Sequence, residues 1–555
     1  MTTLRRASRI WLLLAVGGFA VLAVTIGVPR NPEGEGLAAR TELPAQLALL
    51  ALALVGGLLP RRGQGVAAVL VAVAGNGLGV LAALAYHPAV SVLVLAVFLP
   101  PAVGLWLGWR HGRSGRRVLA LAATTAVLLT GTWAGASRVH TRWFGPAHPV
   151  STQAAPAVDR VVWTWAGAVT TTSATVVAEV VRPARRARLL ITPDRPGAVP
   201  PATAVPVGDD GVVRLPATGL RPATAYRYVI EVDAVADRAR GAGRFRTMPD
   251  GPASFTVAVG SCARTGSSGA VFDAIRAVAP LLYINAGDLH YGNPSRNDVA
   301  TFGELYRRTL TSPAQAALYR SVPVAYVWDD HDYGPNDADA AAATRPAARR
   351  AYGTYVPHYP QPEPGQAVYQ AFTIGRVRFV LTDNRSERTG TSLLGARQLA
   401  WLERELVTAA RTHAVVVWVN PDPWIAAPAR GADDWGGYPR ERRALADVVA
   451  AARIDNLIMI AGDAHMIALD DGSHSGYSGS GYPGFPVLQA GALDRPGSVK
   501  GGPYSHGTFP GGGQFGTITI TDDATSRVGV ELAGRTWRND VLVSYRTTFP
   551  APPPG

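Results

Sequence analysis

Four apolar stretches of the sequence each end in side chains that bind cations or transfer protons. The densest group follows the run 324–328, where Asp329, Asp330, His331 and Asp332 are consecutive. Four adjacent titratable side chains at the end of an apolar run are costly to desolvate unless something neutralises them. Carboxylates and imidazoles are usual metal ligands, so this stretch predicts a metal site.

The other three groups follow apolar runs in the same way. The runs cover residues 255–259, 281–286 and 456–461. They lead into Ser261-Cys262, into Gly287-Asp288 with Tyr291, and into Gly462-Asp463 with His465. Ligands of α/β proteins bind beyond the carboxyl ends of the strands. The four runs therefore predict four strands of an α/β sheet that deliver their polar residues to one edge.

These four blocks, in this order, resemble the PhoD-like branch of the metallophosphatases, the alkaline phosphatase D family. That branch carries a Gly-Ser-Cys block, a Gly-Asp-x-x-Tyr block, a Trp-Asp-Asp-His-Glu/Asp block and a Gly-Asp-x-His block. The resemblance covers roughly residues 155–544. It implies a four-layer αββα domain of the α/β class and hydrolysis of phosphoesters by a hydroxide that two metals activate.

The resemblance also assigns roles to individual residues. It implies six metal ligands: Cys262, Asp288, Tyr291, Asp330, Asp463 and His465. In the family, a carboxylate at the position of Asp288 bridges two metals, and a histidine at the position of His331 assists the leaving group. The structural alternatives are a helix cap for Asp288, packing for Tyr291 and a small buried apolar role for Cys262.

The roles of three further residues are left open by the sequence. Asn336, next to Asp337, either ligates or supports the second metal. Asn420 stands where many metallophosphatases have a metal-binding histidine, a departure that leaves the ligands of the second metal open. Arg385 either clamps a substrate phosphate through two hydrogen bonds or forms a solvated turn with Asp383.

The donor types indicate which metals to expect. Cys262 and Tyr291 are anionic and polarisable when deprotonated, and with Asp288 they suit a trivalent transition metal better than magnesium or calcium. The resemblance implies Fe3+ at that position. It implies Ca2+ at a harder site that includes Asp330, Asp463 and loop oxygens. We therefore expect two or more metal ions, while the absence of a P-loop motif gives no support for nucleotide-driven work.

The first part of the sequence predicts a membrane region. Its apolar stretches are residues 10–28, 44–59, 66–86, 90–109 and 118–136. Most reach the ~20 residues that span a bilayer. Arginines concentrate before the first stretch and after the second and fourth, which predicts a cytoplasmic N-terminus and an outer location for the chain after the fifth. The prediction is a multi-pass protein of the cell membrane with an extracytoplasmic catalytic domain.

Charge and cysteine content exclude other classes. The net charge is +13, but residues 1–143 contain thirteen arginines and three glutamates, a net of +10. The remainder has a net charge of only +3, so the charge does not imply a nucleic-acid partner. With Cys262 as the single cysteine, no intrachain disulfide forms.

The predicted fold is therefore multidomain. It consists of an α-helical transmembrane region, a linker, a small all-β sandwich, an α/β catalytic domain and a Pro-rich tail, at residues 1–143, 144–156, 157–249, 250–548 and 549–555. Residues 220–228 resemble the tyrosine-corner region of a fibronectin type III sandwich. The Gly- and Ser-rich segment 472–513 is expected to form loops over the site.

Two functions from different classes fit the sequence. The leading hypothesis is a membrane-anchored phosphomonoesterase or phosphodiesterase outside the cytoplasm. The alternative is a membrane sensor or scaffold whose metallophosphatase-fold domain is not catalytic, and the complete set of motifs weighs against it. Phosphomonoesters, phospholipid head groups, wall polymers and nucleotides all fit as substrates, and the sequence is compatible with any oligomeric state.

Overall fold

The computed structural model describes residues 160–195, 202–495 and 497–551. The strands before residue 250 are β1 (Val161–Gly167), β2 (Ala174–Val180), β3 (Arg186–Pro193), β4 (Ala204–Pro206), β5 (Val212–Ala217), β6 (Ala225–Val232) and β7 (Val235–Arg246). The next strands are β8 (Phe255–Gly260), β9 (Leu282–Ala286), β10 (Val324–Val327), β11 (Gln370–Ile374), β12 (Val377–Leu381), β13 (Val415–Asn420) and β14 (Leu457–Ala461). The last are β15 (Met466–Asp470), β16 (Val487–Ala490), β17 (Thr508–Pro510), β18 (Gln514–Thr521), β19 (Arg527–Thr536) and β20 (Val541–Pro550). The helices are α6 (Val271–Ala277), α7 (Val299–Thr311), α8 (Pro313–Tyr319), α9 (Asp330–Tyr333), α10 (Arg345–Tyr355), α11 (Gly395–Thr412) and α12 (Pro439–Ala451).

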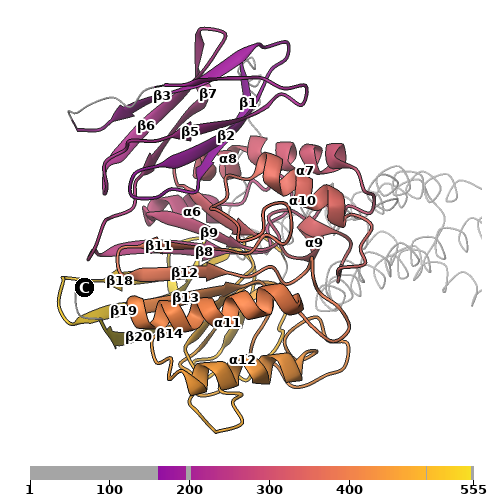
Figure 1. Cartoon of the computed structure of the whole chain (residues 1–555), viewed down its shortest axis with the longest axis vertical. Coiled ribbons are helices and arrows are strands. Elements are labelled where there is room, and N and C mark those ends of the chain that lie inside the picture. Colours follow the sequence, from indigo (N-terminus) through magenta and orange to yellow (C-terminus); the bar gives the residue numbers. More distant parts are fainter. Residues whose placement is uncertain (1–159, 196–201, 496, 552–555) are drawn as a thin grey trace, which may run out of the picture. The chain divides into compact units, whose positions relative to one another are not determined.

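Strands β1 to β7 form a β-sandwich (Figure 1). Strand β6 alternates as expected for a half-buried strand, with Tyr226 and Tyr228 buried on either side of exposed Arg227. The Tyr226 hydroxyl accepts a hydrogen bond from the backbone N–H of Arg221 at 2.9 Å, the contact expected of a tyrosine corner. Assignment of this sandwich to the fibronectin type III class stays a prediction.

Two larger sheets follow. The nine-stranded sheet has the order β20-β19-β18-β8-β9-β10-β1-β2-β5, with β8, β9 and β10 parallel to one another. It includes three strands of the sandwich, because β1 pairs with β10 at Gly167 and Val324. The seven-stranded sheet has the order β11-β12-β13-β14-β16-β15-β17, with β12, β13, β14 and β16 parallel. The predicted boundary near residue 250 is therefore crossed by a continuous sheet.

The side-chain alternation of β13 shows how the layers stack. Val415, Val417 and Val419 pack in the core between the two sheets, whereas Val416 and Trp418 belong to the core beneath α11 and α12. Helices α6, α7 and α8 contribute to the core of the nine-stranded sheet. Figure 1 shows α11 and α12 on the outer side of the seven-stranded sheet, so helices cover both outer faces.

The predicted transmembrane fold class and the multi-pass cell-membrane location are corrected by this structure. In the described ranges, no helix is long and apolar enough to cross a membrane. The longest of these helices, α11, has 18 residues and buries one stripe that includes Leu402 and Leu406, with charged residues on its other face. The described residues form mainly β-sheets with a few helices. The five predicted membrane stretches, within residues 10–136, lie outside the described residues.

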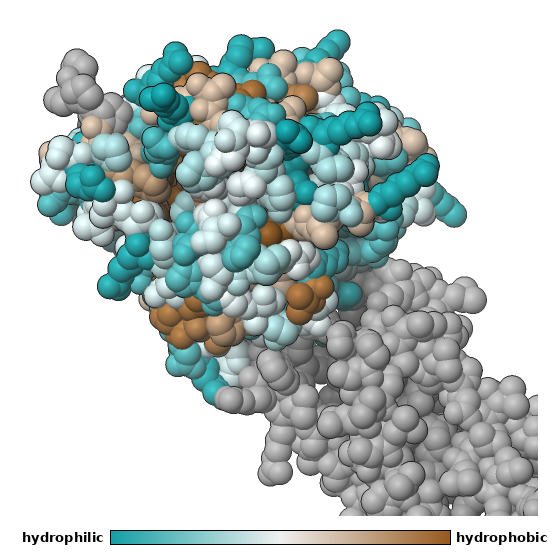
Figure 2. All heavy atoms as spheres, turned by 90° about the horizontal axis from the view of Figure 1, so that it is seen from below, coloured by the Kyte–Doolittle hydropathy of each residue, from teal (hydrophilic) through white to brown (hydrophobic). Residues whose placement is uncertain are grey.

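The face in Figure 2 is mainly hydrophilic to neutral, with several hydrophobic patches, the clearest at the lower left of the coloured part. Among the described residues, the large hydrophobic side chains that are exposed are Val235, Val499 and Val541. They come from three distant parts of the sequence. Single exposed apolar side chains of this kind are normal on a protein surface and indicate no interface.

Gly462 follows β14 at a point where the two sheets come close together. A Cβ atom there would lie 2.2 Å from the carbonyl oxygen of Ala286 at the end of β9. We expect Gly462→Ala to lower the free energy of unfolding by about 1–3 kcal/mol, because backbone must shift to relieve the overlap. Denaturant unfolding measures this. The matched control is Gly353→Ala in α10, where a Cβ meets nothing within 4 Å and should add about 0.5–1 kcal/mol of stability. Equal stability changes in the two variants would contradict this packing.

Candidate metal centre

The four predicted strand ends meet at one edge of the molecule. In the parallel strands, Gly260 pairs with Asn285 and Ala286 pairs with Val327, so β8, β9 and β10 end side by side. Strands β13 and β14 end together in the facing sheet, where Asn420 pairs with Ala461. The polar groups that follow these strands therefore converge between two sheets.

Three of the residues just after these strands have left-handed backbone conformations. Cys262, Asp288 and Asp463 have φ angles of 62°, 54° and 59°. This region is uncommon for residues other than glycine, and such strain concentrates at functional sites where the surrounding structure enforces it. The fold therefore enforces this conformation at three converging strand ends.

The structure gathers the predicted ligands into groups that share Asp288. Donor atoms of Cys262, Asp288 and His465 lie within 4.8 Å of one another, and the Tyr291 hydroxyl is 2.8 Å from Nε2 of His465. A second group brings Asp288 together with Asp330 and His331, again within 4.8 Å. Asp288 is therefore the carboxylate common to the two groups.

Burial leaves some of these carboxylate oxygens without a donor. Asp288 is 1 % exposed and Asp463 is 6 % exposed, yet Oδ1 of the first and Oδ2 of the second have no hydrogen-bond partner. Burial raises the pKa of Asp288, and it raises the pKa of Asp463 to about 8. Buried, unpartnered carboxylate oxygens are expensive unless a cation compensates them, so these residues fit a metal centre.

The softer donors are also fully enclosed. Burial raises the pKa of the Cys262 thiol and of the Tyr291 phenol, and the Asp288 carboxylate raises both further. The Arg495 guanidinium lies over the Tyr291 ring at 4.1 Å from its centroid and acts in the opposite direction on the phenol. A bound cation is the largest local charge in such a site and would favour the deprotonated donors.

A further acidic group extends the site, and sequence reasoning missed part of it. Asp422 and Asp433 have carboxylate oxygens within 4.8 Å of Asp463, and Asp433 also lies in a group with Asp330 and Asp337. Asp422 follows the end of β13 by two residues, so the same strand-end pattern would have found it. Asp433 lies in a loop between β13 and α12, where no periodic signal marks it.

Arg385 lies at the centre of this acidic group instead of facing solvent. It is fully buried, and its guanidinium donates to Asp329 at 2.5 Å, to Asp422 at 2.8 Å and to Asp433 at 2.7 Å. Four of its hydrogen bonds therefore go to carboxylates within the protein. Phosphate binding by Arg385 stays a prediction, and the contacts observed assign it the task of holding three acidic residues together.

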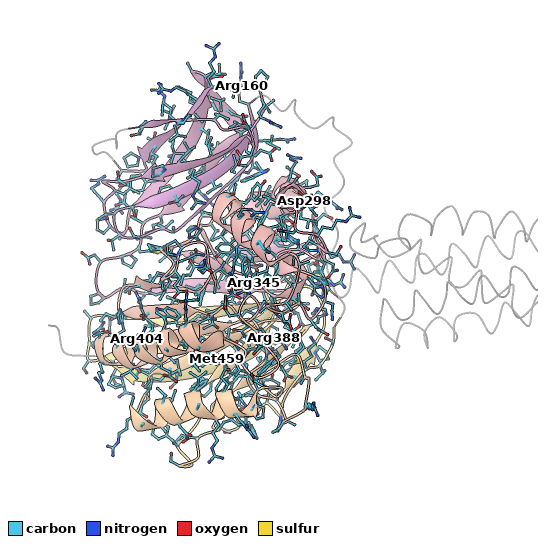
Figure 3. All side chains as sticks on the ribbon, turned by 45° about the vertical axis from the view of Figure 1, so that its right-hand side comes forward. Arg160, Asp298, Arg345, Arg388, Arg404 and Met459 are labelled. Carbon is cyan, nitrogen blue, oxygen red and sulfur yellow. The ribbon has the colours of Figure 1, made fainter. Side chains whose placement is uncertain are left out.

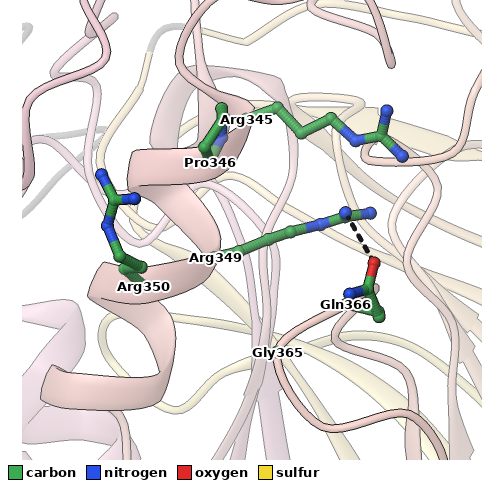
Figure 4. Close-up of a pocket in the computed structure, with 6 residues that line it drawn as sticks. All are labelled: Arg345, Pro346, Arg349, Arg350, Gly365 and Gln366. Carbon is green, nitrogen blue, oxygen red and sulfur yellow. Dashed lines mark hydrogen bonds between the residues drawn. The ribbon is translucent and has the colours of Figure 1, made fainter.

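The loop that carries Arg385 is itself clamped by helix α10. Arg345 and Arg349 both pair with Glu387, and Arg349 also donates to Gln366 at 3.1 Å (Figure 4). Figure 3 labels Arg345 and also Arg388, which follows Glu387 and pairs with Asp433. These pairs fix the loop from both sides.

A cavity of about 580 Å³ opens beside this clamp. It is lined by Arg345, Pro346, Arg349, Arg350, Gly365 and Gln366. None of the predicted site residues lines it. Two of its three arginines are engaged with Glu387, so this cavity belongs to the support of the Arg385 loop and is separate from the strand-end site.

The two predicted asparagines occupy different environments. Asn420 is fully buried, and its side-chain oxygen accepts hydrogen bonds from Trp435 Nε1 at 3.0 Å and from Asn384. Asn336 is exposed, next to Asp337. A metal role for either asparagine stays a prediction, since the buried amide is already occupied by protein donors.

His331 is oriented at the more open side of the site. Its Nδ1 donates to the side-chain oxygen of Asn293 at 2.6 Å, and its ring lies 4.1 Å from the Tyr291 ring, centroid to centroid. Because Asn293 fixes the hydrogen on Nδ1, Nε2 is the nitrogen left to exchange a proton. The side chain is 18 % exposed, which leaves that nitrogen within reach of a bound molecule.

Lys500 is a third residue that the motifs did not identify, after Asp422 and Asp433. Its ammonium donates to Oδ1 of Asp463 at 2.6 Å. Burial alone would lower the pKa of Lys500, but the Asp463 and Asp433 carboxylates raise it above its usual value. The residue lies in the segment 472–513 that was expected to form loops over the site, and composition would have revealed it, because it is the single lysine of the sequence.

The family comparison agrees with this geometry. Residues 285–481 match the model of the PhoD-like phosphatase family. Alkaline phosphatase D of Bacillus subtilis (strain 168) is 25% identical over 187 residues. That match covers 27% of this chain and spans about a third, 32%, of the length of that relative.

Two solved structures show the same fold at low identity. A structure of PhoD has a TM-score of 0.58 at 15% identity, covering 72% of this chain and 92% of that one. A purple acid phosphatase, PPD1, from yellow lupin (Lupinus luteus) seeds has a TM-score of 0.50 at 12% identity, covering 70% and 74%. The family match and the curated relative together support a PhoD-like phosphatase region in this chain, and the two solved structures show its fold.

Removal of the Arg385 guanidinium should destabilise the whole fold. We expect Arg385→Gln to lower the free energy of unfolding by about 3–5 kcal/mol, because three buried or half-buried carboxylates lose their shared partner. Arg350→Gln, at an exposed position of α10, is the matched control and should change stability by less than about 0.5 kcal/mol. Chemical denaturation of both variants decides; a stability of Arg385→Gln equal to that of the wild type would mean that the network does not support the fold.

Proposed function

We propose that this chain hydrolyses phosphoesters at the site where β8, β9, β10 and β14 end. The observation that carries the proposal is the position of Asp288, which belongs both to the group with Cys262 and His465 and to the group with Asp330 and His331. Such a shared carboxylate is the feature that paired cations require. The match of residues 285–481 to the PhoD-like phosphatase family supports the same reaction.

The residues divide into two donor sets. Cys262, Tyr291, Asp288 and His465 would hold one cation, and Asp330 and Asp463 with Asp288 would hold the other. Metal ions bound there would polarise the phosphoryl group and lower the pKa of an attacking water. Asp422 and Asp433 would support the second set, since their carboxylates lie beside that of Asp463.

The two donor sets favour different metals. Thiolate and phenolate donors with a carboxylate suit a trivalent transition ion, and we propose Fe3+ for the set with Cys262 and Tyr291. Oxygen donors alone suit a hard divalent ion, and we propose Ca2+ for the set with Asp330 and Asp463. The opposed softness of the two sets supports a mixed centre over one with two identical ions.

His331 would act on the leaving group. Asn293 holds Nδ1, so a proton on Nε2 of the charged imidazole can be given to the oxygen of the departing alcohol. The position of the ring against Tyr291, at the less buried side of the donor groups, supports this role. No side chain is required to form a covalent bond with phosphorus, because water is the attacking group.

The proposed function is tested by metal analysis of the purified chain together with a screen of monoester and diester substrates. The expected result is iron and calcium, both bound stoichiometrically, with turnover of a phosphoester that a chelator abolishes. Tyrosinate bound to Fe3+ should also produce a visible absorption band that Tyr291→Phe removes. Stable metal binding with no turnover of any phosphoester would contradict hydrolysis and favour a non-catalytic role.

The role of His331 gives a separate prediction. We expect His331→Ala to lower turnover by roughly 10²- to 10⁴-fold, the usual contribution of a general acid, with metal content unchanged. His413→Ala is the matched control, because that histidine lies at the end of α11, apart from the donor groups, and should leave turnover unchanged. Full activity of His331→Ala, or loss of its metals, would show that this assignment is wrong.

A further inference from the structure

One lysine occurs among the 53 basic residues of the sequence, and it lies in the candidate metal centre. Every other basic position is occupied by arginine. The two residues are not equivalent: lysine presents a compact charge with three donors, whereas arginine presents a planar fork suited to carboxylates. The structure thus places the single compact ammonium against Asp463, whereas Arg385 in the supporting network and Arg495 over Tyr291 are planar cations.

Hydrogen bonds fix the backbone on both sides of Lys500. The N–H of Ser498 donates to the carbonyl oxygen of His465 at 3.0 Å, and the N–H of Gly502 donates to that of Ile425 at 2.7 Å. The first bond ties the segment to a predicted metal ligand, and the second ties it to the loop after β13. The backbone that carries Lys500 is therefore anchored two residues before and two residues after it.

Asp463 is able to bind a cation and hold Lys500 at once. Its Oδ1 accepts from the ammonium at 2.6 Å, while its Oδ2 is buried and has no hydrogen-bond partner. A cation bound through Oδ2 would leave the contact with Lys500 intact. The Lys500 side chain is 42% exposed, so its ammonium lies between the buried ligands and the solvent from which a substrate arrives.

We propose that Lys500 binds a terminal phosphoryl oxygen of the substrate and that the preferred substrate class is a phosphomonoester. This inference rests on the proposed phosphoester hydrolase function. A monoester dianion has three terminal oxygens, whereas a diester has two and carries one charge less. Two cations can each take one terminal oxygen, and the ammonium is then the group that matches the third.

The test compares wild type with Lys500→Gln and Lys500→Arg on p-nitrophenyl phosphate and bis-p-nitrophenyl phosphate. Loss of a charge-assisted hydrogen bond should lower kcat/KM for the monoester by roughly 10- to 100-fold. The fold-loss in kcat/KM for the diester should be smaller than that for the monoester by at least about tenfold. The metal content of the variant should stay at the wild-type level. Lys500→Arg should restore part of the monoester rate, because it restores the charge. Arg443→Gln, which removes an exposed charge, is the control and should change neither rate.

Two results would overturn the inference. Equal losses on both substrates would show that Lys500 does not distinguish a third terminal oxygen. Loss of metal in Lys500→Gln would show that the lysine serves only to hold Asp463. If the wild type hydrolyses neither substrate, the proposed function itself fails, and a binding measurement then decides the role of Lys500.

The binding measurement uses the wild-type chain and follows how inorganic phosphate changes the reactivity of the Lys500 amine. An N-hydroxysuccinimide ester reacts with amines, and Lys500 is the one side-chain amine in the sequence. Mass spectrometry of the peptide that contains residue 500 gives the rate of its modification. We expect millimolar phosphate to slow modification at least fivefold, with the α-amino group as internal control. An equal rate with and without phosphate would overturn the inference.

Discussion

Mutual repulsion among buried carboxylates is the constraint on which the rest of the structure depends. The ends of β9, β10, β13 and β14 bring Asp288, Asp330, Asp422 and Asp463 into one small volume. Like charges at such distances cannot all be ionised in a poorly solvated space without cations. Burial raises the pKa of Asp422 to about 6 and that of Asp463 to about 8. Because ionisation of these buried carboxylates is costly, both take up protons more readily than an exposed carboxylate does.

Part of that charge is neutralised by the protein itself, and the division is informative. Arg385 pairs with Asp329, Asp422 and Asp433, and Lys500 pairs with Asp463. Asp288 has no such partner for Oδ1. Arginine and lysine therefore neutralise part of the acidic group, while Oδ1 of Asp288 and Oδ2 of Asp463 are left without a hydrogen-bond partner.

The sequence was sufficient wherever the signal was local. The apolar runs at 255–259, 281–286, 324–328 and 456–461 correspond to β8, β9, β10 and β14, and the polar residues after them do converge. Periodicity identifies such strands because fully buried parallel strands are continuously apolar. The roles of the converging residues come from the resemblance of their motifs to those of the PhoD-like family.

Contacts between distant segments were not predictable in this way. The carboxylate partners of Arg385 lie 37 to 56 residues away along the chain, so no local pattern revealed them. The pairing of Gly167 with Val324 joins the sandwich to the larger sheet across a boundary that composition marked as a domain limit. Hydropathy of the first 143 residues suggested a membrane protein, whereas the described fold contains no helix able to span one. Two missed residues could have been found by simple rules. Asp422 follows the end of a strand, and Lys500 is the single lysine of the sequence.

The most direct measurement of the central claim is the metal content of Asp288→Asn relative to wild type. If Asp288 is shared by two cations, its substitution should lower the content of both metals together, by at least tenfold at equal free metal concentration. Asp209→Asn, at an exposed turn, should leave both unchanged. Wild-type content of both metals in Asp288→Asn, or loss of one metal alone, would contradict the account of a shared carboxylate at the strand ends.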